Sequence, residues 1–136
     1  MLFARYGLMF GLSFLIDTAA AQAIDCPAPQ QRMLTIDLLF GRGAGGLRVS
    51  EQAWTQFLAR EITPRFPDGL TVIDASGQWR SRQGGAILRE RSKVVMIVVP
   101  ENPPVQERID AIAAAYKQQF RQQSVGIVMR SACASF

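Results

Sequence analysis

Hydrophobic and polar residues alternate with different periods along this chain, and the periods predict a succession of strands and helices. Residues 33–40 place apolar side chains at every second position, which predicts a half-buried strand. After Ser50, a suitable N-cap, apolar side chains recur at helical spacing: Trp54, Phe57, Leu58 and Ile62. This pattern predicts an amphipathic helix that ends at Pro64.

The second half of the chain is predicted to form three further strands and one further helix. Residues 70–80 and 86–99 are predicted to be strands joined by a turn, and 94–99 is apolar at every position, which is typical of a central strand. A helix is expected to begin near Pro103 and Pro104. Its apolar stripe consists of Val105, Ile109, Ile112, Tyr116 and Phe120. Alternation over residues 124–130 predicts a last strand.

The order β-α-β-β-α-β predicts an α+β fold of the ferredoxin-like kind, a four-stranded antiparallel sheet with two helices on one face. Right-handed crossovers make the first and third strands central. The sheet face without helices also carries apolar side chains, because residues 94–99 are apolar on both sides. We therefore expect a homodimer packed sheet against sheet.

The N-terminal segment differs in composition from the rest and predicts export. Arg5 is followed by an uncharged, mostly apolar run over residues 7–16 and by the small-residue pattern Ala21-Gln22-Ala23. These features predict a cleaved signal peptide over 1–23, then a leader over 24–32 and a single domain over 33–136 in the periplasm or secreted medium. An uncleaved anchor is the alternative, and would be the chain's contact with a membrane. A lipid on Cys26 is disfavoured because Asp25 precedes it.

Two cysteines stand near the two ends of the exported segment. Cys26 and Cys133 are expected to pair in an oxidising compartment, which would tie both ends of the domain together. The alternative, a reactive thiol, has no support from a histidine or from a Cys-x-x-Cys motif.

Composition then limits the chemistry. The chain has 15 Lys and Arg, 11 Asp and Glu, a formal charge of +4 and no histidine. Mechanisms and metal sites that need an imidazole are excluded, and two cysteines do not make a thiolate zinc site. We expect no cofactor or metal. The basic residues are scattered and form no nucleic-acid-binding signature, so no nucleic-acid partner is expected. The glycine-rich stretch 41–46 lacks the spacing of a phosphate-binding loop.

The densest polar sequence lies on the predicted hairpin, where residues 77–80 face residues 89–93. Guanidinium groups beside a tryptophan are suited to a small anion or polar ligand. Trp79 falls on the opposite strand face from Gln78 and Arg80. The candidate ligand-binding residues are Asp37, Arg65, Gln78, Trp79, Arg80, Arg89, Glu90, Lys93, Tyr116 and Lys117. The alternative is a solvated edge hairpin with Trp79 and Tyr116 as packing residues.

Two of these candidates carry a condition. Asp37 points away from the apolar side of its strand, so a dimer that covered that face would bury it and require an Arg or Lys partner. Lys117 is a candidate base only where burial makes its ammonium easier to deprotonate.

A set of short segments covers most of the chain after Leu34. They are Phe40-Gly41, Trp54 with Phe57, residues 63–72, residues 77–80, Arg89-Glu90 with Ser92-Lys93, and Tyr116-Lys117 with Phe120 and residues 123–125. In these segments the chain resembles an exported bacterial family catalogued as domain of unknown function 3574. The resemblance implies an envelope protein and assigns no reaction.

Three functions fit these observations. The favoured one is a non-catalytic envelope domain that binds a small molecule or an envelope protein. The second is a small-molecule enzyme of the dimeric α+β barrel type, without histidine or metal, in which Asp37, Arg89, Glu90 and Tyr116 would take part. The third is an inhibitor or accessory factor for another secreted protein.

Overall fold

The computed structural model describes residues 24–43, 47–80, 84–101 and 104–136; the predicted signal peptide and the centre of the predicted hairpin turn lie outside these residues. The elements are β1 (Gln31–Gly41), α1 (Glu51–Phe57), β2 (Thr71–Arg80), β3 (Ile87–Pro100), α2 (Val105–Phe120) and β4 (Gly126–Ala134). The sheet order is β2-β3-β1-β4 and every neighbouring pair is antiparallel. The ferredoxin-like prediction and the central positions of β1 and β3 are confirmed.

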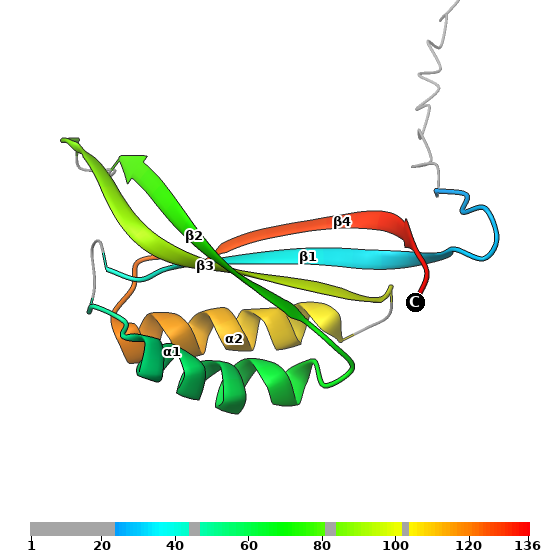
Figure 1. Cartoon of the computed structure of the whole chain (residues 1–136), viewed down its shortest axis with the longest axis horizontal. Coiled ribbons are helices and arrows are strands. Elements are labelled where there is room, and N and C mark those ends of the chain that lie inside the picture. Colours follow the sequence, from blue (N-terminus) through cyan, green and yellow to red (C-terminus); the bar gives the residue numbers. More distant parts are fainter. Residues whose placement is uncertain (1–23, 44–46, 81–83, 102–103) are drawn as a thin grey trace, which may run out of the picture.

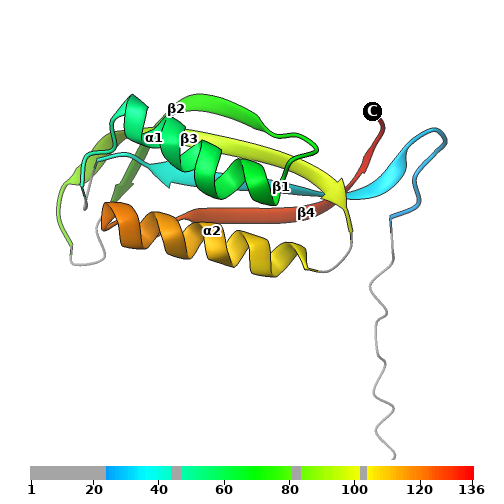
Figure 2. The same ribbon diagram turned by 90° about the horizontal axis from the view of Figure 1, so that it is seen from below.

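Both helices lie on one face of the sheet, as predicted (Figure 1; Figure 2). The alternation of β1 and β3 turns one set of their side chains toward the helices, where they are buried: Ile36, Leu38, Phe40, Val95, Ile97 and Val99. The helices contribute an aromatic cluster. Trp54, Phe57 and Tyr116 contact Phe40 in tilted and edge-to-face arrangements, and Phe120 packs against Phe57 and Tyr116. All five residues of the predicted α2 stripe are buried.

The first helix begins as predicted and ends slightly later. The side chain of Ser50 accepts a hydrogen bond from the Ala53 backbone N–H, so Ser50 is the N-cap. After Phe57 the helix continues as a π-helical stretch (Leu58–Ile62) and a 3-10 turn (Thr63–Arg65). Pro64 has no N–H to continue the helical hydrogen bonds. It lies in the 3-10 turn, and the last helical residue is Arg65.

Two strands are longer than their alternation predicts. β1 begins at Gln31, inside the predicted leader, and β4 ends at Ala134. The two strands pair along their whole length, from Gln31 opposite Ala134 to Leu39 opposite Gly126. The small residues at the end of β4 carry no hydrophobic alternation, so the sequence pattern did not reveal this extension.

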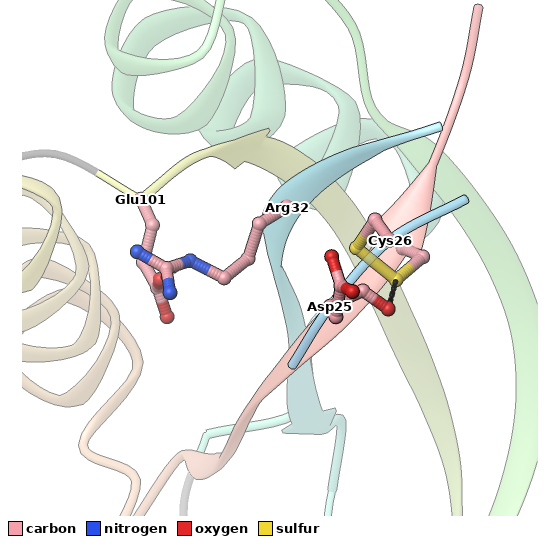
Figure 3. The surroundings of a disulfide bond; sticks show 5 residues. Asp25, Cys26, Arg32 and Glu101 are labelled. Atoms are coloured by element: carbon pink, nitrogen blue, oxygen red, sulfur yellow. Dashed lines mark hydrogen bonds and ion pairs between the residues drawn. A yellow bond between two sulfur atoms is a disulfide. The ribbon is translucent and has the colours of Figure 1, made fainter. Parts of the chain in front are cut away.

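The predicted disulfide between Cys26 and Cys133 is present and spans 107 residues of sequence (Figure 3). It lies where β1 begins and β4 ends, beside an ion pair of 2.9 Å between Arg32 Nε and Glu101 Oε2. Both ends of the described domain therefore lie at one end of the sheet (Figure 1).

The sheet face without helices, which we call the open face, is apolar over its middle. Val94, Met96 and Val98 of β3 are half-buried, and exposed apolar residues lie on the neighbouring strands. These neighbours are Leu39, Ile73 and Val128. The sequence predicted that β3 would be covered on both faces. Within this chain the helices cover one face of β3, and the open face has no covering element among the described residues. No helix in the described part of the chain is long and apolar enough to span a bilayer.

The disulfide generates the first prediction. Replacing both cysteines (Cys26→Ser with Cys133→Ser) should lower the free energy of unfolding by up to about 4–5 kcal/mol, because the unfolded chain regains the freedom of a long loop. Denaturant unfolding of the oxidised protein, with and without a reductant, measures the loss. The double variant is the control, since a reductant should leave its midpoint unchanged. A wild-type midpoint that does not move on reduction would contradict the prediction.

Candidate functional site

The polar half of β3 leaves the hydrophobic core at one end of the molecule. Its alternation places Arg89, Arg91 and Lys93 on the helix side of the sheet, in line with the buried Val95. In the ladder with β2 these cations lie opposite Gln78, Ser76 and Asp74 respectively. Lys93 therefore has a carboxylate as its cross-strand neighbour, whereas the two arginines have uncharged ones.

Lys93 is buried, with 4% of its surface exposed, and is held by two carboxylates. Its Nζ lies 2.6 Å from Oε1 of Glu51 and 2.6 Å from Oδ1 of Asp74. Burial alone would lower the pKa of Lys93, but the hydrogen bonds to Asp74 and Glu51 outweigh it and raise that pKa. Lys93 is therefore fixed in its charged form and joins α1 to the β2–β3 hairpin.

Glu51 holds a second buried cation. Nη1 of Arg42 donates to Oε2 of Glu51 at 2.8 Å, while its Nε and Nη2 donate to the carbonyl oxygen of Val49 at 3.1 and 2.9 Å. Arg42 is 7% exposed. The hydrogen bond from Lys93, assisted by that from Arg42, lowers the pKa of Glu51. The Glu51 carboxylate thus pairs with two cations, one on β3 and one directly after β1.

A cleft of about 540 Å³ adjoins the ion pair between Arg42 and Glu51, and we call it the arginine cleft. It is bordered by the polar half of β3, by the two residues that directly follow β1, and by the residues at the start of α1. Its lining residues are Arg42, Gly43, Arg48, Val49, Ser50, Glu51, Arg89, Glu90 and Arg91. An adjoining hollow of about 440 Å³ shares Arg89, Glu90 and Arg91 and adds Gln78. Figure 1 shows that the start of α1 and the start of β3 lie at the same end of the fold.

Glu90 and Trp79 lie on the open face and bond to each other. Nε1 of Trp79 donates to Oε1 of Glu90 at 2.9 Å, and the Gly43 backbone N–H donates to Oε2 at 2.8 Å. Gly41 makes this approach possible, since a Cβ there would lie 2.6 Å from Oε1 of Glu90. The predicted cluster is therefore divided: Trp79 faces away from the arginines, as its strand position indicates.

The remaining predicted residues fall into different places. Tyr116 is fully buried in the core; its hydroxyl donates to the Gly41 carbonyl oxygen at 2.7 Å, and burial raises its pKa. Arg80 is exposed at the end of β2. Lys117 is exposed on α2, so the condition for a buried base is not met. Arg65 is paired with Glu61 at 2.9 Å, at the other end of the first helix from the cleft.

Asp37 lies on the open face, as predicted, and has a partner within the same chain. Its Oδ2 is 2.9 Å from Nη2 of Arg130 on β4, and 19% of its side chain is exposed. Oδ1 is buried with no hydrogen-bond donor among the described residues. The expected Arg partner is thus supplied by the neighbouring strand without a second subunit.

Four charged residues of the arginine cleft are not among the candidates selected from the sequence: Arg42, Arg48, Glu51 and Arg91. Arg42 lies within the glycine-rich stretch 41–46, Arg48 follows that stretch, Glu51 follows the predicted N-cap, and Arg91 belongs to the polar segment 89–93. The order of elements did contain a signal for these residues. A right-handed crossover from β1 to β2 passes over β3, so the start of the first helix is brought beside β3. Among the described residues, no group of three or more metal-ligating side chains is present.

Comparison with known proteins places the chain in a family. The pattern of the family described as "Protein of unknown function (DUF3574)" matches residues 35–136, and the chain belongs to that family. No functionally curated protein matches the chain.

Solved structures share the fold. A phage SAM lyase in complex with S-methyl-5'-thioadenosine is 12% identical, with a TM-score of 0.57 over 85% of this chain and 97% of that one. The apo form of the phage enzyme gives a TM-score of 0.55 at 12% identity, over 85% and 95% of the two chains. CutA from Synechococcus elongatus is 13% identical, with a TM-score of 0.49 over 76% and 80%. At 12% identity the similarity to the phage enzyme is one of fold alone.

Glu51 generates the second prediction. Because its pKa is lowered in the folded chain, its contribution to stability is complete above about pH 4.3, the usual pKa of a glutamate, and is lost as the pH falls through the lower folded value. Wild-type protein should therefore lose stability on acidification below about pH 4. Glu51→Gln should be less stable at neutral pH and should show a flatter acid branch.

Denaturant unfolding between neutral pH and pH 3 measures both effects. Glu107→Gln is the matched control, because Glu107 is exposed and forms no ion pair with a described residue. An acid branch for Glu51→Gln as steep as that of the control would disprove the role given to this carboxylate.

Proposed function

We propose that this protein is an exported domain that binds a small molecule in the arginine cleft and does not transform it. One observation carries the proposal: the cleft is open while its acids are engaged. Glu51 is held by Arg42 and Lys93, and Glu90 by Trp79 and the Gly43 backbone. The hydrogen bond from Lys93 lowers the pKa of Glu51, so this carboxylate is a poor proton carrier, whereas the arginines are permanently charged binding groups.

The alternative is the small-molecule enzyme considered from the sequence. Of its four expected residues, Asp37 is paired on the open face, Tyr116 is enclosed in the core and Glu90 is hydrogen-bonded. Arg89 alone borders the cleft with an exposed side chain. The likeness to the phage lyase is one of fold and supplies no substrate. Chemical conversion of a bound ligand would revive this alternative.

Two features support the proposal that the protein is exported. The signal-like segment over residues 1–23 and the disulfide that closes the domain both fit a periplasmic or secreted protein. The partners we propose are a small molecule in the cleft and a second copy of the chain on the open face.

Native mass spectrometry of protein taken from the periplasm tests binding and export together. We expect the mass of a chain that begins near Ile24, together with an additional mass that is released unchanged on denaturation. Arg89→Gln should lose this mass, while Arg60→Gln, an exposed arginine outside the cleft, should keep it. Recovery of a converted product would favour the enzyme, and wild-type protein that never carries or accepts a ligand would refute the proposal.

The open face supports a homodimer. It presents apolar side chains on all four strands, and a two-fold axis would pack the same apolar patch of each copy against that of the other. Packing two such faces together would cover Val94, Met96 and Val98 with the side chains of an identical copy.

Sedimentation at micromolar concentration tests the dimer. Wild-type protein should sediment as a dimer, and Ile73→Glu should sediment as a monomer because it places a charge on the open face. Ile127→Glu is the matched control: Ile127 is 38% exposed, close to the 43% of Ile73, but it lies on the helix side of the sheet opposite Leu38. A monomeric wild type would overturn the dimer, as would equal effects of the two variants.

A further inference from the structure

The arginine cleft holds positive charge that its own carboxylates do not neutralise. Around it stand five cations, Arg42, Arg48, Lys93, Arg89 and Arg91, and three carboxylates, Glu51, Asp74 and Glu90. These eight side chains together carry a net charge of +2. The buried members are neutralised first, since Arg42 and Lys93 take Glu51 and Asp74. The excess falls on the exposed arginines.

The strand ladder shows why the excess is concentrated on β3. Lys93 lies opposite Asp74, whereas Arg91 lies opposite Ser76 and Arg89 opposite Gln78. The neighbour of Arg91 on the β1 side is Arg42, another cation. The Arg42 backbone N–H donates to the Arg91 carbonyl oxygen at 3.0 Å, which places the two residues next to each other. Like charges in neighbouring positions on one sheet face repel each other. Arg89 and Arg91 therefore share one strand face with no carboxylate opposite either of them.

Arg48 adds positive charge from a different segment that lines the cleft, the residues before α1. It precedes the N-cap of α1 and lines the same cleft as Arg89 and Arg91. None of these three arginines forms an ion pair with a described residue. Their guanidinium forks remain available to an oxyanion, and the Ser50 hydroxyl, which accepts from Ala53, retains its own proton for donation.

Resting on the proposed ligand-binding function, we propose that the ligand is a small organic dianion, such as a dicarboxylate or a phosphate monoester. Its negative charge lies between Arg89 and Arg91 of β3 and Arg48 before α1. Same-face residues two apart on a strand are separated by about 6.6 Å, which suits two carboxylates on a short chain or one phosphate between two forks. A dianion neutralises the net charge of +2, and a volume of about 540 Å³ suits a small metabolite.

Titration calorimetry with two dianions tests this inference directly on the disulfide-intact protein. Succinate represents dicarboxylates and glycerol phosphate represents phosphate monoesters, with acetate as the monoanion and glycerol as the neutral comparison. At fixed ionic strength we expect at least one dianion to bind about tenfold more tightly than acetate, and glycerol not to bind.

Single variants identify the groups responsible. Arg89→Gln, Arg91→Gln and Arg48→Gln should each weaken dianion binding about tenfold, and Arg89→Lys should restore part of it because it keeps the charge without the fork. Arg60→Gln, the same change outside the cleft, should bind as wild type does. Unfolding midpoints of all four glutamine variants show whether any loss of binding reflects loss of structure.

The outcomes separate this inference from the proposed function. Dianions that bind equally well to cleft variants and to Arg60→Gln would show diffuse attraction to a basic surface, and would overturn the inference. A neutral or cationic molecule that co-purifies and is lost in Arg89→Gln would also overturn it, while the proposed ligand-binding function would stand. If neither dianions nor a co-purified molecule bound, both proposals would fall.

Discussion

The burial of Lys93 is the interaction on which this end of the molecule depends. A lysine that takes the place of an apolar residue on the helix side of β3 must find carboxylates, because a buried ammonium without them is strongly destabilising. It finds Glu51 at the start of α1 and Asp74 on β2, at 2.6 Å each. Glu51 in turn holds Arg42, which fastens the segment before α1. One buried charge thus determines where the first helix begins relative to the sheet.

The same interaction divides β3 into two parts with different physical properties. Beyond Lys93 the helix-side positions are Val95, Ile97 and Val99, all within the core. Before it they are Arg91 and Arg89, which are exposed and line the arginine cleft. Lys93 stands between them and belongs to both, since its stem packs at the edge of the core while its ammonium reaches the polar residues. The hydrophobic core between the sheet and the helices therefore ends at Lys93, and the cleft begins at the next residue on the same strand face, Arg91.

The fold was predictable because its patterns are local. Alternation in β1 and the helical stripe of α2 each fix which side chains are buried, and the order of elements then leaves few arrangements of the sheet. The extension of β4 to Ala134 was not predictable, because Ser131 to Ala134 are small and the reason for their pairing is the matching length of β1. The disulfide was predictable from two cysteines near the chain ends.

The site was predicted in part. The sequence showed that Arg89 and Lys93 share one strand face and that Trp79 lies on the other, and both statements hold in the structure. It did not show that Glu51 would bridge Lys93 and Arg42, because that contact joins residues 42 positions apart through the packing of a helix on the sheet. Tyr116 and Arg65 were selected for their residue type alone, and their surroundings give them structural partners.

The position of the disulfide has a consequence for how the domain is presented to its surroundings. Arg32 is opposite Cys133 at one end of the sheet, and Gly41 is opposite Ser92 at the other. Nine residues of extended strand separate these points by about 30 Å. Any tether, neighbouring domain or membrane segment joined to either end of the domain would therefore attach at the end of the sheet that holds the disulfide, away from the cleft. The cleft would then lie at the end of the sheet farthest from whatever surface holds the protein.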